Sequence, residues 1–330
     1  MRLNSRDLSW QVIISALLRR GMVLIVLVAL MVYFTSQSDR FLQQRNLINI
    51  LEQNAALIII TVGMTLTMLI AGIDLSVGSV AALAGAISAG LIVNNGLPFG
   101  VSVVITLAMG FGIGLINGSL IIWGKLPPFI ATLAMLGIGR GLTLVYTEGR
   151  PISLNGVEEY TFYGRGDVVL PLLGEIPVSV LVALAVVIIS GVVLSTTRFG
   201  LHVYAIGGNE ETARLAGVPV NRVKMIAYGS SGMLAALGGM LLTARLFSAQ
   251  PQAAVGLELD AIAAAVLGGV SLFGGVGNVF GAVTGGLLVG VLSNGMNLLR
   301  LASFLQQMIQ GVVLVLAVAV DMITKRVEGL

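Results

Sequence analysis

Side chains that could do acid–base, nucleophilic or metal chemistry are scarce in this sequence. Its 330 residues include no cysteine and one histidine, His202. Thiolate metal sites and disulfides are therefore excluded, and His202 lacks the partners that a metal site or a catalytic triad would need. Neither paired carboxylates nor a Ser/His/Asp set stands out. The sequence predicts no catalytic residue, no metal site and no enzyme activity of its own.

One polar cluster interrupts an otherwise apolar region. The stretch AGIDLSVGS contains Gly72, Asp74, Ser76 and Gly78. A carboxylate at membrane depth is costly and normally faces protein or a water-filled cavity. The glycines allow a break between helices, and Asp74 or Ser76 could cap the helix that follows. A structural cap, which would tolerate Asn or Ser in place of Asp74, is the favoured interpretation, and direct contact with a transported solute is the alternative.

Two other charged positions stand in or beside apolar segments. Arg140 lies inside LGIGRGLTLVY, where an unpaired cation is unfavourable. It could form a salt bridge with an acid elsewhere or line a polar transport pathway. Glu258 and Asp260 stand just before an apolar segment, where acids stabilise a helix N-terminus. Pathway lining or contact with an external partner is the second interpretation of this pair.

The longest polar stretch is AIGGNEETARLAGVPVNRVKMIAYG. Asn209 is a favourable N-cap, and Glu210 and Glu211 place negative charge at the positive end of a helix. Gly217 is a favourable residue just beyond a helix end. Together these signals predict a helix of about two turns at 210–216.

This short helix should be held by contact with something else, because nucleation makes so short a helix marginal in water. Ala213, Leu215 and Ala216 suggest a face that docks in a groove, and Arg214 with the two preceding glutamates suggests a charged rim. We therefore predict that the helix docks on a partner, and a solvated loop between membrane spans is the alternative.

The composition is that of an integral membrane protein. Of the residues, 57% are hydrophobic and 10% charged, and the mean hydropathy is +1.01. A bilayer core about 30 Å thick needs about 20 apolar residues per helical span. The sequence predicts one all-α domain over 1–330, a polytopic transmembrane bundle of about ten spans with a short polar helix between two of them. The expected spans are 17–36, 47–70, 75–94, 98–123, 128–146, 176–196, 224–247, 258–274, 277–299 and 303–322.

The distribution of Lys and Arg predicts the orientation of this bundle. Cytoplasmic loops carry an excess of these residues, and with ten spans the excess falls on the side of both termini. The tail 1–16 and the loop 198–224 would then be cytoplasmic, and the acidic loop 147–175 would lie outside, in the periplasm. The net charge of +3 is too small to indicate nucleic-acid binding.

Several ordered blocks resemble one family of membrane proteins. The segment YAIGGNEETARLAGVPVNRVKMIAY resembles the cytoplasmic coupling loop in the permease subunits of ribose-type monosaccharide ABC importers. VGMTLTMLIAGIDLSVGSVAALAGA (62–86), PPFIATLAMLGIGRGLTLVYTEGRPI (127–152) and SAQPQAAVGLELDAIAAAVLGGVSLFGG (248–275) are similar to family segments in the same order. The resemblance extends from about residue 40 to 322.

The resemblance implies a permease in the bacterial inner membrane that imports a monosaccharide, with ribose or a related pentose expected. It implies as partners a second permease copy, cytoplasmic ATP-binding subunits and a periplasmic sugar-binding protein. The helix 210–216 would sit in a groove of the ATPase and transmit its closure to the spans. The chain has no GxxxxGKS phosphate loop, so ATP and Mg²⁺ would be bound by the ATPase, and this chain would hold no cofactor.

Other classes of function remain as alternatives. An ion-coupled secondary transporter or a channel for a small polar solute would more often show several intramembrane acids, and Asp74 is the clearest case here. An integral membrane enzyme is disfavoured because no catalytic constellation can be assembled.

Overall fold

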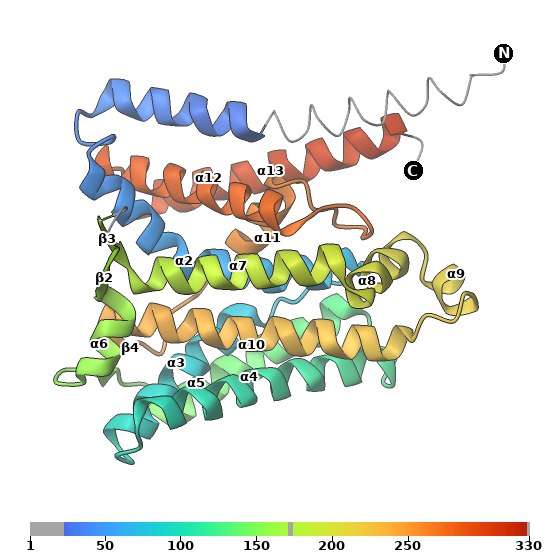
Figure 1. The fold of residues 1–330 in the computed structure, drawn as a ribbon, viewed down its shortest axis with the longest axis horizontal. Helices are drawn as coiled ribbons and strands as arrows, with labels where there is room; N and C mark the ends of the chain where they lie inside the picture. The colour runs from blue at the N-terminus through green and yellow to red at the C-terminus, as the bar shows by residue number, and fades with distance from the viewer. Residues whose placement is uncertain (1–22, 171–173, 329–330) are drawn as a thin grey trace.

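The computed structural model describes residues 23–170 and 174–328, most of them helical (Figure 1). The predicted tail 1–16 and the start of the first predicted span lie outside these residues. After the helix Val23–Gln37, the elements in chain order are α2 (Gln44–Leu69), α3 (Val77–Val93), α4 (Phe99–Ile122), α5 (Pro128–Thr147), β1 (Ile152–Ser153), α6 (Glu158–Arg165), β2 (Asp167–Leu170), β3 (Gly174–Pro177), α7 (Val178–Thr196), α8 (Arg198–Gly208), α9 (Glu210–Leu215), α10 (Val220–Leu246), β4 (Ser248–Ala249), α11 (Leu257–Leu267), α12 (Val279–Leu298) and α13 (Ser303–Glu328).

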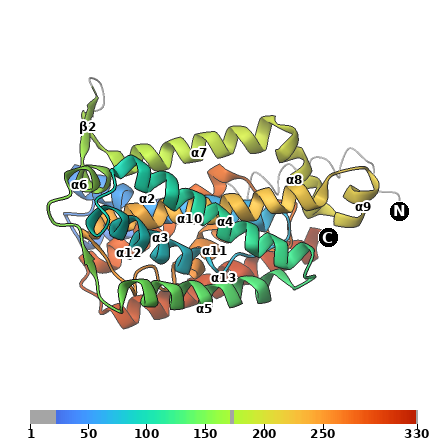
Figure 2. The ribbon, with the colours of Figure 1, turned by 90° about the horizontal axis from the view of Figure 1, so that it is seen from below.

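The long helices run side by side along the longest axis of the molecule (Figure 1). The short helix α9 projects at one end, which we call the α9 end. Helix α6 and the strands gather at the opposite end, which we call the strand end (Figures 1 and 2). Helix α10 connects the two ends through the middle of the bundle and packs against α2, α3 and α4. It therefore contacts three other long helices while reaching from one end of the bundle to the other.

Glycines let α10 approach its neighbours closely. A Cβ at Gly114 of α4 would clash with the carbonyl oxygen of Tyr228 in α10, and a Cβ at Gly239 of α10 would clash with that of Ala81 in α3. Small residues at such crossings allow the backbone contact that drives helix association in lipid. Several of the 43 glycines in the sequence thus serve the packing of the bundle.

Replacing Gly114 by leucine is expected to lower the yield of folded protein strongly, because overpacking commonly costs about 1–3 kcal/mol and here the obstacle is backbone. Gly112→Leu is the matched control on the same helix, because a Cβ there meets nothing within 4 Å. The yield of monodisperse protein after detergent extraction measures both, and equal yields would contradict the packing role of Gly114.

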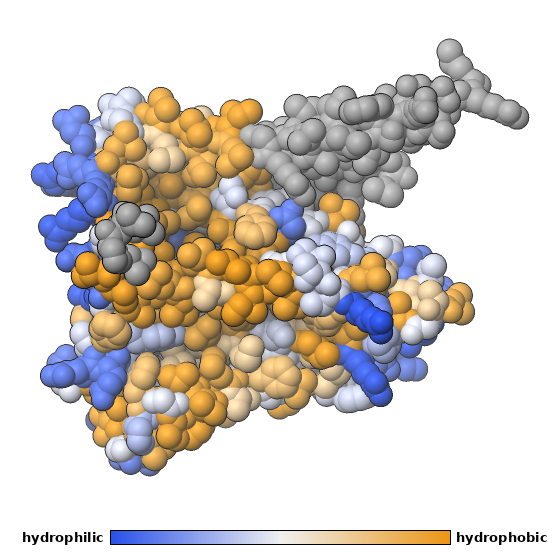
Figure 3. Space-filling model, in the orientation of Figure 1, coloured by the Kyte–Doolittle hydropathy of each residue, from blue (hydrophilic) through white to orange (hydrophobic). Residues whose placement is uncertain are grey.

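In the described part of the chain, six helices are long and apolar enough to cross a membrane, namely α2, α4, α5, α7, α10 and α12. Figure 3 shows apolar residues over the middle of the molecule and hydrophilic residues at both ends. The helical, polytopic class is therefore confirmed. The finer expectation of about ten spans remains a prediction, because the helix Val23–Gln37, α3 and the apolar part of α13 are shorter.

The predicted span 258–274 differs most from the structure. Helix α11 has 11 residues, which is about 16 Å of helix and half of the bilayer core. The chain then turns through Gly269 and Gly274, whose φ angles are 84° and 89°. Glycine adopts this left-handed conformation without the strain of a Cβ, so Gly269, two positions after Leu267, lets the helix end inside an apolar run.

The predicted loop 147–175 is folded at the strand end. Strands β2 and β3 form an antiparallel hairpin. Strand β1 pairs with β4, with Ile152 opposite Ala249, and so links the connection after α5 to the connection after α10. Tyr160 of α6 is fully buried, and its hydroxyl forms a hydrogen bond with Ser88 of α3.

Candidate functional site

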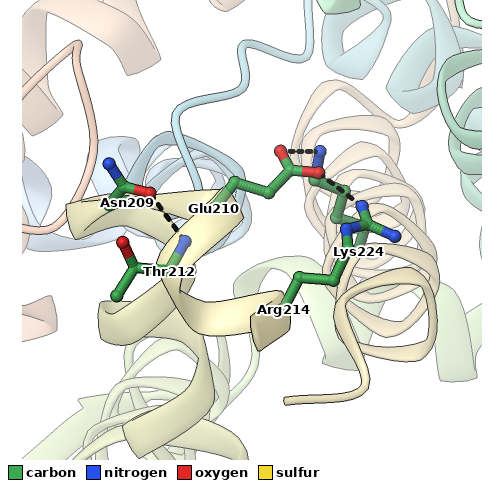
Figure 4. Close-up of polar contacts among 5 residues, drawn as sticks. All are labelled: Asn209, Glu210, Thr212, Arg214 and Lys224. Carbon is green, nitrogen blue, oxygen red and sulfur yellow. Dashed lines mark hydrogen bonds and ion pairs between the residues drawn. The ribbon is translucent and has the colours of Figure 1, made fainter. Parts of the chain in front are cut away.

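The polar stretch around residue 210 forms the short helix that its sequence predicts. Helix α9 covers Glu210–Leu215, and Ala216 is its C-cap. The side-chain Oδ1 of Asn209 accepts a hydrogen bond of 2.8 Å from the backbone N–H of Thr212, as an N-cap does (Figure 4). Gly217 follows with φ of 82°. Local sequence signals thus account for both ends of α9.

Glu210 is bound to its own chain rather than presented to a partner. Its carboxylate contacts the guanidinium of Arg214 at 2.9 Å and the ammonium of Lys224, in the first turns of α10, at 2.6 Å (Figure 4). Burial alone would raise the pKa of Glu210, but the hydrogen bonds and charges of Lys224 and Arg214 outweigh it and hold the pKa below its usual range. The pair fixes α9 to the beginning of α10.

The structure differs from the predicted docking face of α9 at one residue. Ala213 is 4% exposed and packs into the protein core, so it faces its own chain. Glu211, Leu215 and Ala216 are exposed, and Leu215 has 84% of its surface accessible. Leu215 is therefore a large apolar side chain at the tip of a polar helix, and the described residues leave most of it uncovered.

The ion pairs of Glu210 should make stability depend on pH in a defined direction. Because the folded state lowers the pKa of Glu210, its contribution is present above the ordinary glutamate pKa and is lost as the pH falls through the lowered value. We expect Glu210→Gln to lower the thermal midpoint at neutral pH and to have no effect at acid pH. Glu211→Gln is the control, and a Glu210→Gln effect that persists unchanged in acid would contradict the assignment.

Asp74 lies at the centre of a buried polar cluster between α3, α4 and α10. It is 1% exposed. Its Oδ1 accepts hydrogen bonds from the backbone N–H and the hydroxyl of Ser76, at 3.0 and 2.5 Å, and its Oδ2 accepts one of 2.8 Å from the hydroxyl of Ser231 in α10. The amide of Asn117 in α4 donates to the Ser76 hydroxyl at 2.9 Å. The carboxylate therefore links the start of α3 to α10, and the Ser76 hydroxyl extends the cluster to α4.

This geometry refines the predicted cap. Ser76 is the N-cap residue of α3, but no side chain accepts a hydrogen bond from the later amides of that helix's first turn. Asp74 closes a tight turn before the helix and then reaches Ser231, 157 positions away. Asp74 thus makes structural contacts between helices, and its role as a cap or in contact with a solute remains a prediction.

The glycines on either side of Asp74 make room for two polar side chains. A Cβ at Gly72 would clash with the hydroxyl of Tyr228, and one at Gly78 would clash with Glu258 Oε2. Within the described residues, neither of these two buried oxygens has a hydrogen-bond partner. Unsatisfied buried polar atoms are uncommon and point to a ligand, a water or a proton as the missing partner.

Arg140 and Asp260 do not join the Asp74 cluster. The guanidinium of Arg140 donates to the carbonyl oxygens of Pro251 and Ala253, at 2.9 and 2.8 Å, and so holds the α10–α11 connection. In the described part of the chain it forms no ion pair. Asp260 lies with Glu258 in the first turn of α11, where acids favour the helix dipole. A role of either residue in a pathway remains a prediction.

Sequence reasoning missed the residues of α10 that contact α9 and the turn around Asp74. Lys224, Tyr228 and Ser231 are four and three positions apart, a spacing that places them on one helix face. These residues form a polar stripe along a mostly apolar helix, and their spacing could have been recognised in the sequence. Its partners could not, because they lie elsewhere in the sequence. No three His, Asp or Glu side chains gather as metal ligands in residues 23–170 and 174–328.

Buried polar residues held between helices that could cross a bilayer are typical of polytopic membrane transport proteins. Residues 46–318 match the family described as branched-chain amino acid transport system, permease component. The chain belongs to this family.

Several characterised relatives match nearly the whole chain. A ribose import permease protein of Escherichia coli is 44% identical over 90% of this chain and 92% of its own length. A ribose import permease protein of Bacillus subtilis is also 44% identical, over 91% of this chain and 89% of its own. A D-allose transport system permease protein of Escherichia coli is 35% identical over 91% of this chain and 90% of its own. No solved structure matches the chain.

Proposed function

We propose that this chain is the transmembrane permease subunit of an ATP-driven importer for a monosaccharide, with ribose or a related pentose as the solute. The observation that carries the proposal is the 44% identity to ribose import permease proteins over about nine tenths of the chain. The D-allose permease among the relatives agrees on the class of solute. The chain has no phosphate loop, so a separate ATPase subunit binds ATP and Mg²⁺ and supplies the energy.

In this proposal α9 is the coupling helix and lies in the cytoplasm. Its exposed side chains, Glu211, Leu215 and Ala216, contact a groove of the ATPase. The Glu210–Lys224 ion pair transmits movement of α9 to α10. The Ser231–Asp74 hydrogen bond then transmits it from α10 to the turn before α3. These contacts form a continuous mechanical connection from the α9 end to the interior of the bundle.

The remaining partners follow from this orientation. The termini and the loop 198–224 are cytoplasmic, and the strand end with loop 147–175 faces the periplasm, where a sugar-binding protein delivers the solute. A second permease copy completes the pathway, and alternating access moves the sugar inward. A neutral sugar that must pass quickly needs few strong contacts, which agrees with the small number of charges within the bundle.

The test is reconstitution in liposomes of the full chain with the ATPase that co-purifies with it and with a sugar-binding protein. Uptake of labelled ribose, with arabinose, xylose and allose as competitors, identifies the solute. We expect uptake to require ATP hydrolysis and to stop when the ATPase carries a hydrolysis-blocking substitution. Uptake that continues with the blocked ATPase under an ion gradient would overturn the proposal in favour of an ion-coupled secondary transporter.

A further inference from the structure

A cavity of about 590 Å³ opens at the α9 end of the bundle. It lies between the end of α2, the turn that joins α4 to α5, helix α9 and the first turns of α10. Polar and charged side chains line it from several of these elements: Lys125, Glu210, Arg214, Asn221, Lys224 and Tyr228. Gly72 and Tyr228 border both the cavity and the Asp74 cluster, whereas Asp74, Ser76 and Ser231 do not line the cavity.

The cavity carries a net positive charge. Three of its lining side chains are cations and one is a carboxylate. Glu210 pairs with Arg214 and Lys224. Lys125, in the turn before α5, has no ion pair with any residue that the structure describes. The helix ends contribute little, because α5 and α10 begin at the cavity while α2 and α4 end there, so their dipoles offset one another.

Tyr228 adds a hydrogen-bond donor at the inner end of this cavity. The residue is 1% exposed, and its hydroxyl has no partner among the described residues. The hydroxyl occupies the space that a Cβ at Gly72, another lining residue of the cavity, would otherwise fill. A buried hydroxyl without an acceptor loses free energy, and a ligand oxygen would restore it.

We propose that this cavity binds a phosphate group. A phosphate offers several acceptor oxygens at once, so it can satisfy Lys125, Lys224 and the Tyr228 hydroxyl together, and it favours charge-assisted bonds to cations. The cavity is far larger than an inorganic phosphate, so the natural ligand carries an organic part. That ligand is either the headgroup of an anionic phospholipid or a soluble phosphate ester. The inference does not depend on whether α9 docks on an ATPase.

The test uses the full chain in nanodiscs of phosphatidylcholine, which has no net charge. Inorganic phosphate is added in one arm and phosphatidylglycerol is incorporated in the other, with sulfate at matched ionic strength as the reference. The thermal midpoint and ³¹P NMR line broadening report binding, because a ligand that binds the folded state stabilises it by an amount that grows with the logarithm of its concentration relative to Kd. We expect stabilisation by at least one phosphate source beyond that by sulfate.

Substitutions of lining residues test whether the phosphate group binds in this cavity. Lys125→Asn should weaken binding about tenfold, since a hydrogen bond to a charged group contributes about 1.5 kcal/mol or more. Asparagine tolerates the φ of 54° that Lys125 adopts. Tyr228→Phe should weaken binding by a smaller factor. Arg222→Gln is the matched control, because Arg222 is an exposed cation of the same α10 terminus that does not line the cavity.

Each outcome decides the proposal. Binding of phosphatidylglycerol alone identifies a lipid headgroup, and binding of inorganic phosphate identifies a soluble compound. Equal effects of phosphate and sulfate, or equal binding by the Lys125→Asn and Arg222→Gln variants, would overturn the site. Absence of binding in both arms would do the same. None of these readouts requires transport, so failure here is distinguishable from failure of the proposed import function.

Discussion

Asp74→Ala is expected to abolish ATP-driven uptake. The substitution leaves the amide and hydroxyl of Ser76 and the hydroxyl of Ser231 without their acceptor in a region closed to water. Each buried donor left unsatisfied costs about 1–3 kcal/mol. Because the bond to Ser231 links the turn before α3 to α10, the loss would break the connection on which the proposed coupling depends.

Asp74→Asn separates this role from a need for the negative charge. Asparagine keeps one oxygen for Ser76, and its amide can donate to a Ser231 hydroxyl that rotates to accept. We expect it to retain a substantial part of the uptake. The measurement is initial uptake in proteoliposomes with equal amounts of inserted permease, together with ATPase activity. Full uptake by Asp74→Ala would refute the structural role of the carboxylate.

Ser231→Ala and Ser230→Ala form a matched pair on α10. Ser231 bonds to Asp74, whereas Ser230 is its sequence neighbour on another face of the helix. Only Ser231→Ala should reduce uptake, and it should do so while ATPase activity remains, because ATP hydrolysis is then no longer linked to the transmembrane helices. Equal effects of the two variants would indicate a general sensitivity of α10.

Leu215→Asp is expected to prevent co-purification of the ATPase while the permease stays folded in the membrane. Burying a leucine side chain contributes about 1.5–3 kcal/mol, and a carboxylate in its place would also have to lose its water. Because Leu215 is 84% exposed, its replacement removes little that holds the permease itself together. The expected loss of affinity is therefore more than tenfold.

Charge reversal at Glu211 tests the same surface independently. Glu211→Arg should weaken ATPase binding, and Glu211→Gln should have a smaller effect. Leu215→Met is the conservative control, because it keeps an apolar side chain of similar volume. Binding is measured by the amount of ATPase retained at matched permease levels after detergent extraction. Unchanged retention and uptake in both Leu215→Asp and Glu211→Arg would contradict the coupling assignment.

The parts of the fold that depend on residues close together in the sequence could be predicted from it. The cap at Asn209 and the glycine beyond α9 act within a few positions, so their residue types are sufficient signals. The apolar lengths of α2, α4 and α10 likewise follow from composition. The early end of α11 could not be predicted, because an apolar run continues past it and only the glycine turns stop the helix.

The candidate sites required contacts between distant positions. The sequence indicates that Asp74 is special, but it does not show that Ser231 is the partner, because many hydroxyls in the chain could serve. The two neighbouring glutamates of α9 cannot be distinguished by residue type. In the fold, Glu210 pairs with Lys224, whereas Glu211 is exposed. Burial of Ala213 depends in the same way on how α9 lies on its own chain.

The strand end has a mechanical consequence. Strands β1 and β4 join the connections that follow α5 and α10, and Arg140 of α5 holds two carbonyl groups just beyond α10. These two helices are thus pinned together at one end, while a cavity separates the beginning of each at the other. Any movement of α5 relative to α10 would therefore be restrained at the strand end and greatest beside α9.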